Sequence, residues 1–327
     1  MTNALTASSP LVIWTGIGLL FCRWLPPMIP RWLGRLLYWV GVPIQIFTLV
    51  HRTDFSQLIW FSPLLAFITL VVGFVIAQLC YPLQRRWCLP QWVYFRPPVV
   101  ELGLPQQEER QYQGSYLLSS ILGNTGFVGL GIATPLLSSN GLAWAVFYAI
   151  TQNAVGTYGL GAFLSSYYGR DQNSPWWLKF RDVLTVPTIW AFGLGLLSRS
   201  WVFAPVVSQS LDMEVAIVIP TAFILIGMRL SQLPGWQSFR MAVIPTVIKA
   251  LFLPLLMTIV VYLMGLRGDP ALAVVLMAGT PTAFAALILA EEYELNSDLP
   301  TASIALTTVA LILVLPLWIF LFRSVFV

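Results

Sequence analysis

Long apolar stretches separated by short polar, proline-rich or glycine-rich breaks run along the whole chain. Each stretch is close to the about 20 residues that a helix needs to cross the hydrocarbon core of a bilayer. The pattern therefore predicts ten transmembrane helices. Their expected positions are near residues 8–25, 33–50, 58–83, 114–137, 141–165, 183–201, 213–229, 240–265, 270–291 and 299–322.

Composition supports a membrane protein and excludes a soluble one. Of the 327 residues, 58% are hydrophobic and 9% are charged, against about 25% charged residues in soluble domains. Little sequence is left for a soluble domain. The net charge of +4 comes from basic residues scattered in short connections, so we expect no nucleic-acid partner and a lipid bilayer as the surroundings.

The N-terminus and the cysteines add little chemistry. No basic region and small-residue cleavage site precede the first apolar stretch, so we expect it to be retained as a helix. Cys22, Cys80 and Cys88 are odd in number and lack the spacing of metal ligands, which favours free thiols. We expect no metal site and no cofactor.

The distribution of basic residues predicts the orientation. Alternate connections place twelve Arg and Lys residues on one side and four on the other, with Lys249 inside a span. The richer side is expected to be cytosolic. Both termini then lie outside the cytosol, residues 84–113 form a cytosolic loop, and a plasma (inner) membrane location follows.

Prolines and glycines recur in the two halves of the chain. Pro43 and Pro220 each interrupt an apolar span, and Gly123–Gly126 (GNTG) in the fourth span has a counterpart in Gly279–Thr282 (GTPT) in the ninth. This recurrence predicts a first repeat at 1–168 and a second at 169–327. Because five spans is an odd number, the repeats must have opposite topology, as in many secondary transporters.

The two glycine-containing segments predict broken helices. A break in a membrane helix exposes backbone N–H and C=O groups, which survive only beside protein or a water-filled cavity. If the fourth and ninth helices cross at their breaks, the N-terminal ends of their second halves point positive dipoles into one cavity, which favours an anion. The alternative is close helix packing through the small residues Gly123, Gly126, Gly129 and Gly131.

The segments LGNTGFVGLGIA (122–133), KALFLP (249–254) and AGTPTAFAALILAEEY (278–293) resemble hallmark segments of the auxin efflux carrier family, of which the plant PIN exporters are distant members. The resemblance extends over essentially the whole chain in the number and order of spans. It implies a 5+5 inverted repeat, broken and crossing helices four and nine in a mobile domain that moves against a scaffold, and organic anions as substrates.

The resemblance also implies a set of binding residues. Asn124 matches the crossover asparagine and Pro281 the crossover proline. The fifth span would line the pocket through Tyr148, Gln152 and Asn153. The other expected binding residues flank the two breaks: Thr125, Gly126, Thr280 and Thr282.

This chain departs from the family pattern at two places. Gly131 stands where the family often has a proline, so we expect a looser crossing geometry. The acidic and basic pair in the third span of the plant exporters is missing, and that span offers only Gln78. Any mechanism that relies on the pair is therefore in doubt.

Charged residues within or next to the spans are candidates for coupling or charge pairing. Lys249 lies about 13 Å along its helix from Arg240, near mid-membrane, where an unpaired ammonium costs at least about 2.5 kcal/mol. It could attract a carboxylate or donate to freed carbonyls. Glu291, Glu292, Glu294 and Asp298 form an acidic group on the expected cytosolic side, where we expect no Lys or Arg to accompany them. A solvated helix end is the expected reading, and the alternative is a role of Glu291 and Glu292 in coupling.

Taken together, the sequence predicts a non-enzymatic carrier of a small organic anion such as a carboxylate, acting by elevator-type alternating access and exporting its substrate. The rival hypotheses are a receptor or regulatory protein that binds a ligand without moving it, and an intramembrane enzyme, which lacks a catalytic pair within the spans. A proton or sodium as coupling ion and a homodimer as assembly remain open alternatives.

Overall fold

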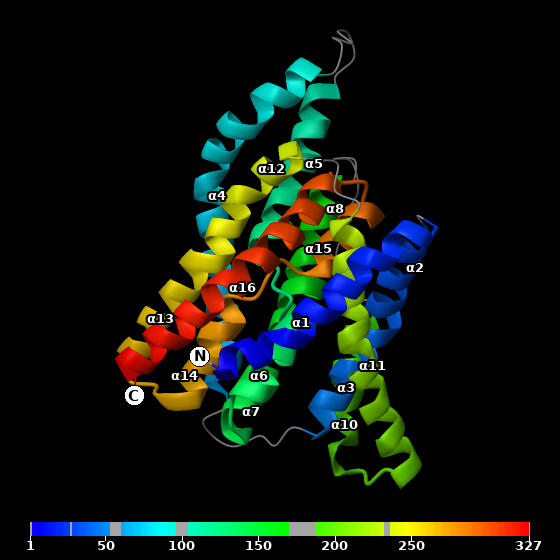
Figure 1. Cartoon of the computed structure of the whole chain (residues 1–327), viewed down its shortest axis with the longest axis vertical. Coiled ribbons are helices and arrows are strands. Elements are labelled where there is room, and N and C mark those ends of the chain that lie inside the picture. The colour runs from blue at the N-terminus through cyan, green and yellow to red at the C-terminus, as the bar shows by residue number, and fades with distance from the viewer. Residues whose placement is uncertain are drawn as a thin grey trace.

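A computed structural model describes residues 2–26, 28–52, 60–95, 104–169, 187–231 and 236–326. In these residues the chain is helical, and its only β-type pairing is an isolated bridge between two loop residues. Figure 1 shows the helices bundled side by side, with α15 near the middle of the bundle, α4 and α13 on one side and α2 and α11 on the other. The prediction of an all-α protein is confirmed.

The first half of the chain contains the helices α1 (Thr2–Phe21), η1 (Cys22–Trp24), α2 (Met28–Leu36), η2 (Leu37–Gly41), α3 (Val42–Arg52), α4 (Phe61–Phe95), α5 (Leu104–Ile121), η3 (Thr125–Gly129), α6 (Leu130–Leu136), α7 (Ser139–Thr151), η4 (Gln152–Gly161) and α8 (Ala162–Gly169). The second half contains α10 (Pro187–Leu197), η5 (Ser198–Ser200), α11 (Pro205–Leu230), α12 (Trp236–Val247), η6 (Ile248–Phe252), α13 (Leu253–Leu263), α14 (Gly268–Ala278), α15 (Phe284–Glu292) and α16 (Asp298–Phe326).

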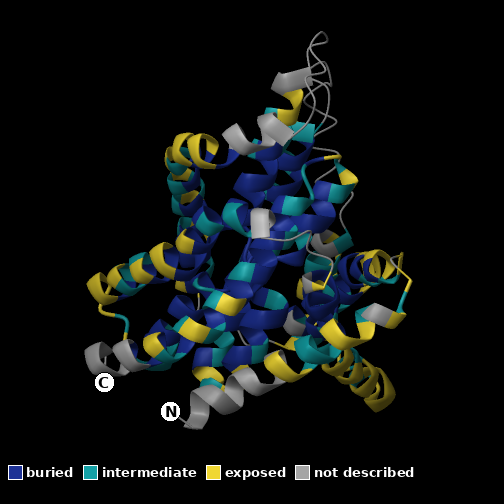
Figure 2. Cartoon of the chain, turned by 45° about the horizontal axis from the view of Figure 1, so that its top comes forward, coloured by how far each residue is buried: buried dark blue, intermediate teal, exposed yellow. Residues whose placement is uncertain are grey.

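Five helical stretches within the described residues are long and apolar enough to cross a membrane: Met28–Arg52, Phe61–Cys88, Pro205–Arg229, Phe239–Leu263 and Asp298–Ile319. Shorter apolar helices accompany them at Val12–Phe21, Thr125–Leu136 and Gly268–Ala278. Buried residues gather in the middle of the bundle and exposed ones on the outer helices (Figure 2). The exposed side includes large apolar side chains such as Leu79, Leu197 and Leu313, as expected of a surface that faces lipid.

The connection predicted at 84–113 is wrong in its extent. Helix α4 continues through Phe95 and α5 already begins at Leu104. The hydropathy pattern ends at Arg85 and Arg86, but Arg, Gln and Leu are good helix formers in water as well. A helix can therefore leave the membrane without ending, and hydropathy alone does not detect this.

Prolines inside the long helices free backbone carbonyls, and side chains from neighbouring helices donate to them. Pro245 cannot donate to Met241 O, and Gln84 Nε2 donates there at 2.9 Å. Pro254 likewise leaves Ala250 O, which receives the indole N–H of Trp318 at 3.2 Å. These interhelical bonds tie α12 to α4 and η6 to α16.

Helix α1 crosses α11 at a close backbone contact. A Cβ atom on Gly227 would collide with Thr15 O, and one on Gly18 would collide with Ile224 O. Only glycine permits this approach, which is typical of small-residue crossings in membranes. Close packing through glycine thus occurs at a crossing that the sequence did not single out.

Four stretches within the described residues are π-helical: η2, η3, η4 and η6. Such segments are rare and occur frequently at functional sites. The three cysteines are free, as predicted.

Candidate functional site

The two predicted broken helices are broken, and their breaks touch. Gly123 and Thr282 form the isolated antiparallel bridge. Asn124 N donates to Pro281 O at 2.8 Å, and Ala283 N donates to Leu122 O at 2.9 Å. The non-helical residues therefore satisfy one another's backbone, which is the condition for an irregular segment to survive inside a membrane protein.

Four helix ends meet at this crossing. The carbonyl ends belong to α5, which stops at Ile121, and α14, which stops at Ala278. The N–H ends belong to η3, which starts at Thr125, and α15, which starts at Phe284. Because helix termini carry partial charges, the crossing has two negative ends and two positive ends.

Side chains complete the hydrogen bonding of the breaks. The carbonyl of Met277, to which Pro281 cannot donate, accepts from the hydroxyl of Thr280 at 2.8 Å. The hydroxyl of Thr282 donates to Ser119 O at 2.8 Å, and Thr282 N donates to the hydroxyl of Thr307 at 3.0 Å. The threonines of the ninth span thus hold the crossing together.

A pocket of about 620 Å³, including its open mouth, lies against the crossing. Backbone and side chains of η3 and α15 form one wall through Gly126, Phe127, Ala283, Phe284, Ala285 and Ile288. The remaining lining residues are Gly34, Leu37, Tyr38, Val42, Gln45, Ile46, Gly123, Asn124, Ala149, Ile150, Asn153, Tyr158 and Leu225. Among the described residues the lining is mostly apolar and contains no charged side chain.

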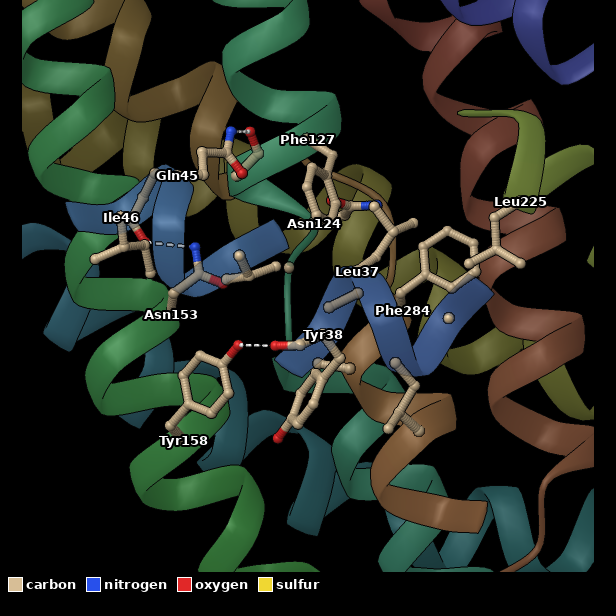
Figure 3. Close-up of a pocket in the computed structure, with 18 of the residues that line it drawn as sticks. Leu37, Tyr38, Gln45, Ile46, Asn124, Phe127, Asn153, Tyr158, Leu225 and Phe284 are labelled. Carbon is tan, nitrogen blue, oxygen red and sulfur yellow. Dashed lines mark hydrogen bonds between the residues drawn. The ribbon is translucent and has the colours of Figure 1, made fainter. Parts of the chain in front are cut away.

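Three amide side chains contribute polar groups to the pocket, in addition to the hydroxyl groups of Tyr38 and Tyr158 (Figure 3). Gln45 Nε2 donates to Gly126 O at 3.1 Å, and Asn153 Nδ2 donates to Ala149 O at 2.9 Å. Asn124 Oδ1 accepts weakly from Val128 N at 3.5 Å, as a cap of η3. Asn124 Nδ2 is buried and has no acceptor in the described part of the chain. One donor at the crossing is therefore available to a ligand.

Lys249 lies directly behind Gly123. It is 2% exposed, and a Cβ atom on Gly123 would lie 2.9 Å from Lys249 Nζ, 2.6 Å from the hydroxyl of Thr280 and 3.6 Å from Gln152 Nε2. Gly123 itself lines the pocket. The ammonium is thus separated from the pocket by a residue without a side chain.

The structure brings together only part of the predicted site. Three predicted residues line the pocket: Asn124, Gly126 and Asn153. Four others support the crossing without lining the pocket: Thr125, Thr280, Pro281 and Thr282. Tyr148 is buried away from the lining, and Gln152 donates to Ile121 O at the end of α5 at 3.1 Å. Gln78 accepts from Gln113 Nε2 at 3.4 Å and is not a lining residue.

The acidic group at the end of α15 has arginine partners, so the expectation that no basic residue accompanies it is wrong. Glu291 Oε1 lies 3.2 Å from Arg229 Nη1 and 4.0 Å from Arg31 Nε, and Glu292 pairs with Arg35 at 3.8 Å. The arginines come from α2 and α11, which are distant in sequence. Local sequence therefore gave no sign of them.

Several lining residues were missed, namely Gln45, Tyr38, Tyr158, Phe127 and Phe284. The π-helical segments place some of them. Tyr38 belongs to η2 and Tyr158 to η4, where its hydroxyl donates to Tyr38 O at 3.5 Å. Gln45 follows the predicted break at Pro43 by two residues, which was a usable signal. An apolar side chain such as Phe284 looks like any other lipid-facing or core residue in the sequence.

Apolar helices long enough to cross a bilayer, around a pocket at two crossed helix breaks, indicate an integral, multi-pass membrane protein. Residues 107–319 match the model of the family described as "Membrane transport protein", and the chain belongs to this family, which is the auxin efflux carrier family that its motifs resemble.

Two relatives carry names of the same kind. An "uncharacterized transporter" of Methanothermobacter thermautotrophicus is 26% identical over 287 residues, which cover 88% of this chain and 87% of the relative. An "uncharacterized transporter" of Methanocaldococcus jannaschii is 25% identical over 213 residues, 63% of this chain and 67% of the relative. The family and these names indicate a membrane transporter.

Proposed function

We propose that the protein is a carrier that moves a small organic anion, with its carboxylate bound at the crossing of the two broken helices. The observation that carries this proposal is the free Nδ2 donor of Asn124, buried in the pocket beside the positive ends of η3 and α15. A helix N-terminus contributes about 0.3 to 1 kcal/mol to binding an anion, and a hydrogen bond to a charged group about 1.5 to 3 kcal/mol.

Lys249 adds positive charge from behind Gly123. In a mostly apolar environment the field of an ammonium is weakly screened, so it reaches a carboxylate in the pocket without direct contact. The same ammonium offsets the negative ends of α5 and α14. This arrangement favours an anion at the crossing and accounts for a charge that would otherwise be costly in the membrane.

The pocket lining favours a substrate with one anionic group. Beyond the crossing the walls are mostly apolar or aromatic, and none of the described lining residues carries a positive charge. A second carboxylate there would lose its hydration without gaining a partner, which is strongly unfavourable. A monocarboxylate with a small apolar body fits the lining better than a dicarboxylate.

The packing of the helices supports alternating access between two bodies. Helix α1 crosses α11 through Gly227, and α10 packs on α3, where Gly195 lies against Val50. We propose that these helices and α2 form a scaffold. The crossing belongs to the other body, and the pocket lies between the two. This division is consistent with the inverted repeats at 1–168 and 169–327, with ten spans, an elevator-type movement and export across the plasma membrane.

Reconstitution into proteoliposomes tests the proposal. Initial rates are measured for a panel of radiolabelled mono- and dicarboxylates, with and without proton and sodium gradients. Asn124→Ala should lower the rate about ten- to hundredfold, because it removes a charge-assisted hydrogen bond of about 1.5 to 3 kcal/mol. Asn140→Ala is the matched control, since Asn140 is exposed at the start of α7.

A third variant separates binding from folding. Asn124→Asp keeps an oxygen that accepts from Val128 N, but removes the donor and adds a negative charge, so it should be as inactive as Asn124→Ala. Wild-type flux in a folded Asn124→Ala protein would remove the proposed site. Saturable binding of a carboxylate without any flux would instead favour a receptor.

A further inference from the structure

Three helices that line the pocket converge at one of its ends. A Cβ atom on Gly34 of α2 would lie 3.5 Å from a methyl carbon of Leu225 of α11 and 3.9 Å from the terminal carbon of Ile288 of α15. All three residues line the pocket. Their contact therefore marks the end of the pocket away from the start of α15 at the crossing, about 6 Å along the helix for the four residues from Phe284 to Ile288.

Charged residues follow one turn beyond this contact on each of the three helices. Arg31 precedes Gly34, Arg229 follows Leu225, and Glu291 follows Ile288. Glu291 lies 3.2 Å from Arg229 and 4.0 Å from Arg31. Two guanidinium groups, those of Arg229 and Arg31, therefore meet the single carboxylate of Glu291 just beyond this end of the pocket, while Arg35 and Glu292 form a separate, exposed pair.

Arg229 is the buried member of this group, and its hydrogen-bonding capacity is largely unused. It is 7% exposed. Its Nη1 donates to a single oxygen of Glu291, while its Nε is buried without an acceptor among the described residues. A guanidinium has five N–H donors in a fixed fork that suits a carboxylate bound through both oxygens. The bond to Glu291 thus engages only one of the five N–H donors, and the guanidinium could bind a carboxylate through more of them.

We propose that Arg229 is an entry site for the carboxylate of the substrate, and that Glu291 occupies it as a tethered competitor in this conformation. The inference rests on the proposed transport of an organic anion and extends it to a second, positively charged station at the end of the pocket. The incoming carboxylate would displace Glu291 from Arg229. Glu291 would keep Arg31 as a partner at an exposed position, so neither charge is left buried and unpaired.

The exchange also has a mechanical consequence. The bond between Glu291 and Arg229 ties α15 to α11, and α15 starts at the crossing with the pocket residues Phe284 and Ala285. Movement of the crossing against α11 requires this bond to open. Binding of the anion at Arg229 supplies a replacement partner at the moment when Glu291 is released, which links the arrival of substrate to the release of α15.

The test uses the full-length protein in proteoliposomes and the carboxylate that the wild type transports. The KM is taken from initial rates over a range of concentrations. Glu291→Gln removes the competing charge but keeps the size of the side chain, and should lower the KM about three- to tenfold. Glu292→Gln is the matched control, because Glu292 is half exposed and pairs with the exposed Arg35. It should leave the KM within about twofold of the wild type.

Two further variants guard against a purely structural effect. Arg31→Gln removes the exposed partner that would hold the displaced Glu291, and should raise the KM about two- to threefold. Arg229→Gln combined with Glu291→Gln should raise the KM above that of the wild type, because the neutral pair lacks the charge that binds the substrate. A structural latch alone predicts instead that the double variant behaves like Glu291→Gln.

The outcomes separate this inference from the proposed function. An unchanged or higher KM for Glu291→Gln, in protein whose flux still depends on Asn124, would overturn the entry site and leave the carrier intact. If Glu291→Gln does not fold, Arg31→Gln takes its place. A wild-type KM for Arg31→Gln would then overturn the entry site. Flux that no longer depends on Asn124 would instead contradict the proposed function.

Discussion

The crossing is most directly perturbed at Gly123. A Cβ atom there would lie 2.6 Å from the hydroxyl of Thr280 and 2.9 Å from Lys249 Nζ, where ordinary contact begins at 3.4 Å. In Gly123→Ala the two groups must therefore move by 3.4 − 2.6 = 0.8 Å and 3.4 − 2.9 = 0.5 Å. The hydroxyl of Thr280 is held by Met277 O, and Lys249 is buried, so neither group moves without strain.

The size of the effect follows from overpacking. An extra methyl group in a well-packed interior costs about 1 to 3 kcal/mol, and displacing the crossing by this amount lowers the population of the binding-competent form about 5- to 150-fold. Gly123→Ala should reduce the initial rate in proteoliposomes within this range and lower the midpoint of thermal unfolding in detergent. Gly193→Ala in α10 is the control, because a Cβ atom there meets nothing within 4 Å. A Gly123→Ala protein with the wild-type transport rate and the wild-type unfolding midpoint would show that the crossing tolerates a side chain at position 123.

Three further changes test separate parts of the structure. Lys249→Met should raise the KM for the anion about tenfold without lowering the unfolding midpoint, because replacing a buried charge by an apolar side chain is often neutral or stabilising; an unchanged KM would exclude the electrostatic role. Gly227→Ala should destabilise the protein by about 1 to 3 kcal/mol through its collision with the backbone of α1, whereas Gly16→Ala, with open space around it, should not. Asp269→Ala should cost about 1 to 3 kcal/mol, since Asp269 Oδ2 accepts from Ser138 N at 2.7 Å; an unchanged unfolding midpoint in detergent would show that this contact contributes nothing.

The sequence predicted the breaks because backbone chemistry is local. Continuous helix is disfavoured by Gly123 and Asn124 in the fourth span and by Pro281 in the ninth. The structure has non-helical residues at both places. The contact between the breaks, through Asn124 N and Pro281 O, was expected from the family resemblance. The full set of ten spans and their inverted arrangement stay predictions.

The parts that the sequence did not predict depend on long-range packing. Arg229 and Glu291 are separated by 62 positions, and nothing in either segment indicates their partner. The π-helical register of η4, which brings Asn153 and Tyr158 to the same pocket, depends on tertiary contacts and is not visible in apolar periodicity. Helix α4 likewise ends far beyond its apolar stretch because helix propensity and hydropathy are separate properties.

Protection of an introduced cysteine by substrate measures directly whether the transported anion occupies the pocket at the crossing. Ala285 lines the pocket and is partly exposed. Ala285→Cys is made in protein whose three native cysteines are replaced by serine and is labelled with a water-soluble methanethiosulfonate, with Asn140→Cys as the exposed control. The account predicts that the transported carboxylate slows labelling at position 285, with a concentration dependence that matches its KM, and has no effect at position 140. Equal labelling at position 285 with and without saturating substrate, in protein that still transports, would contradict it.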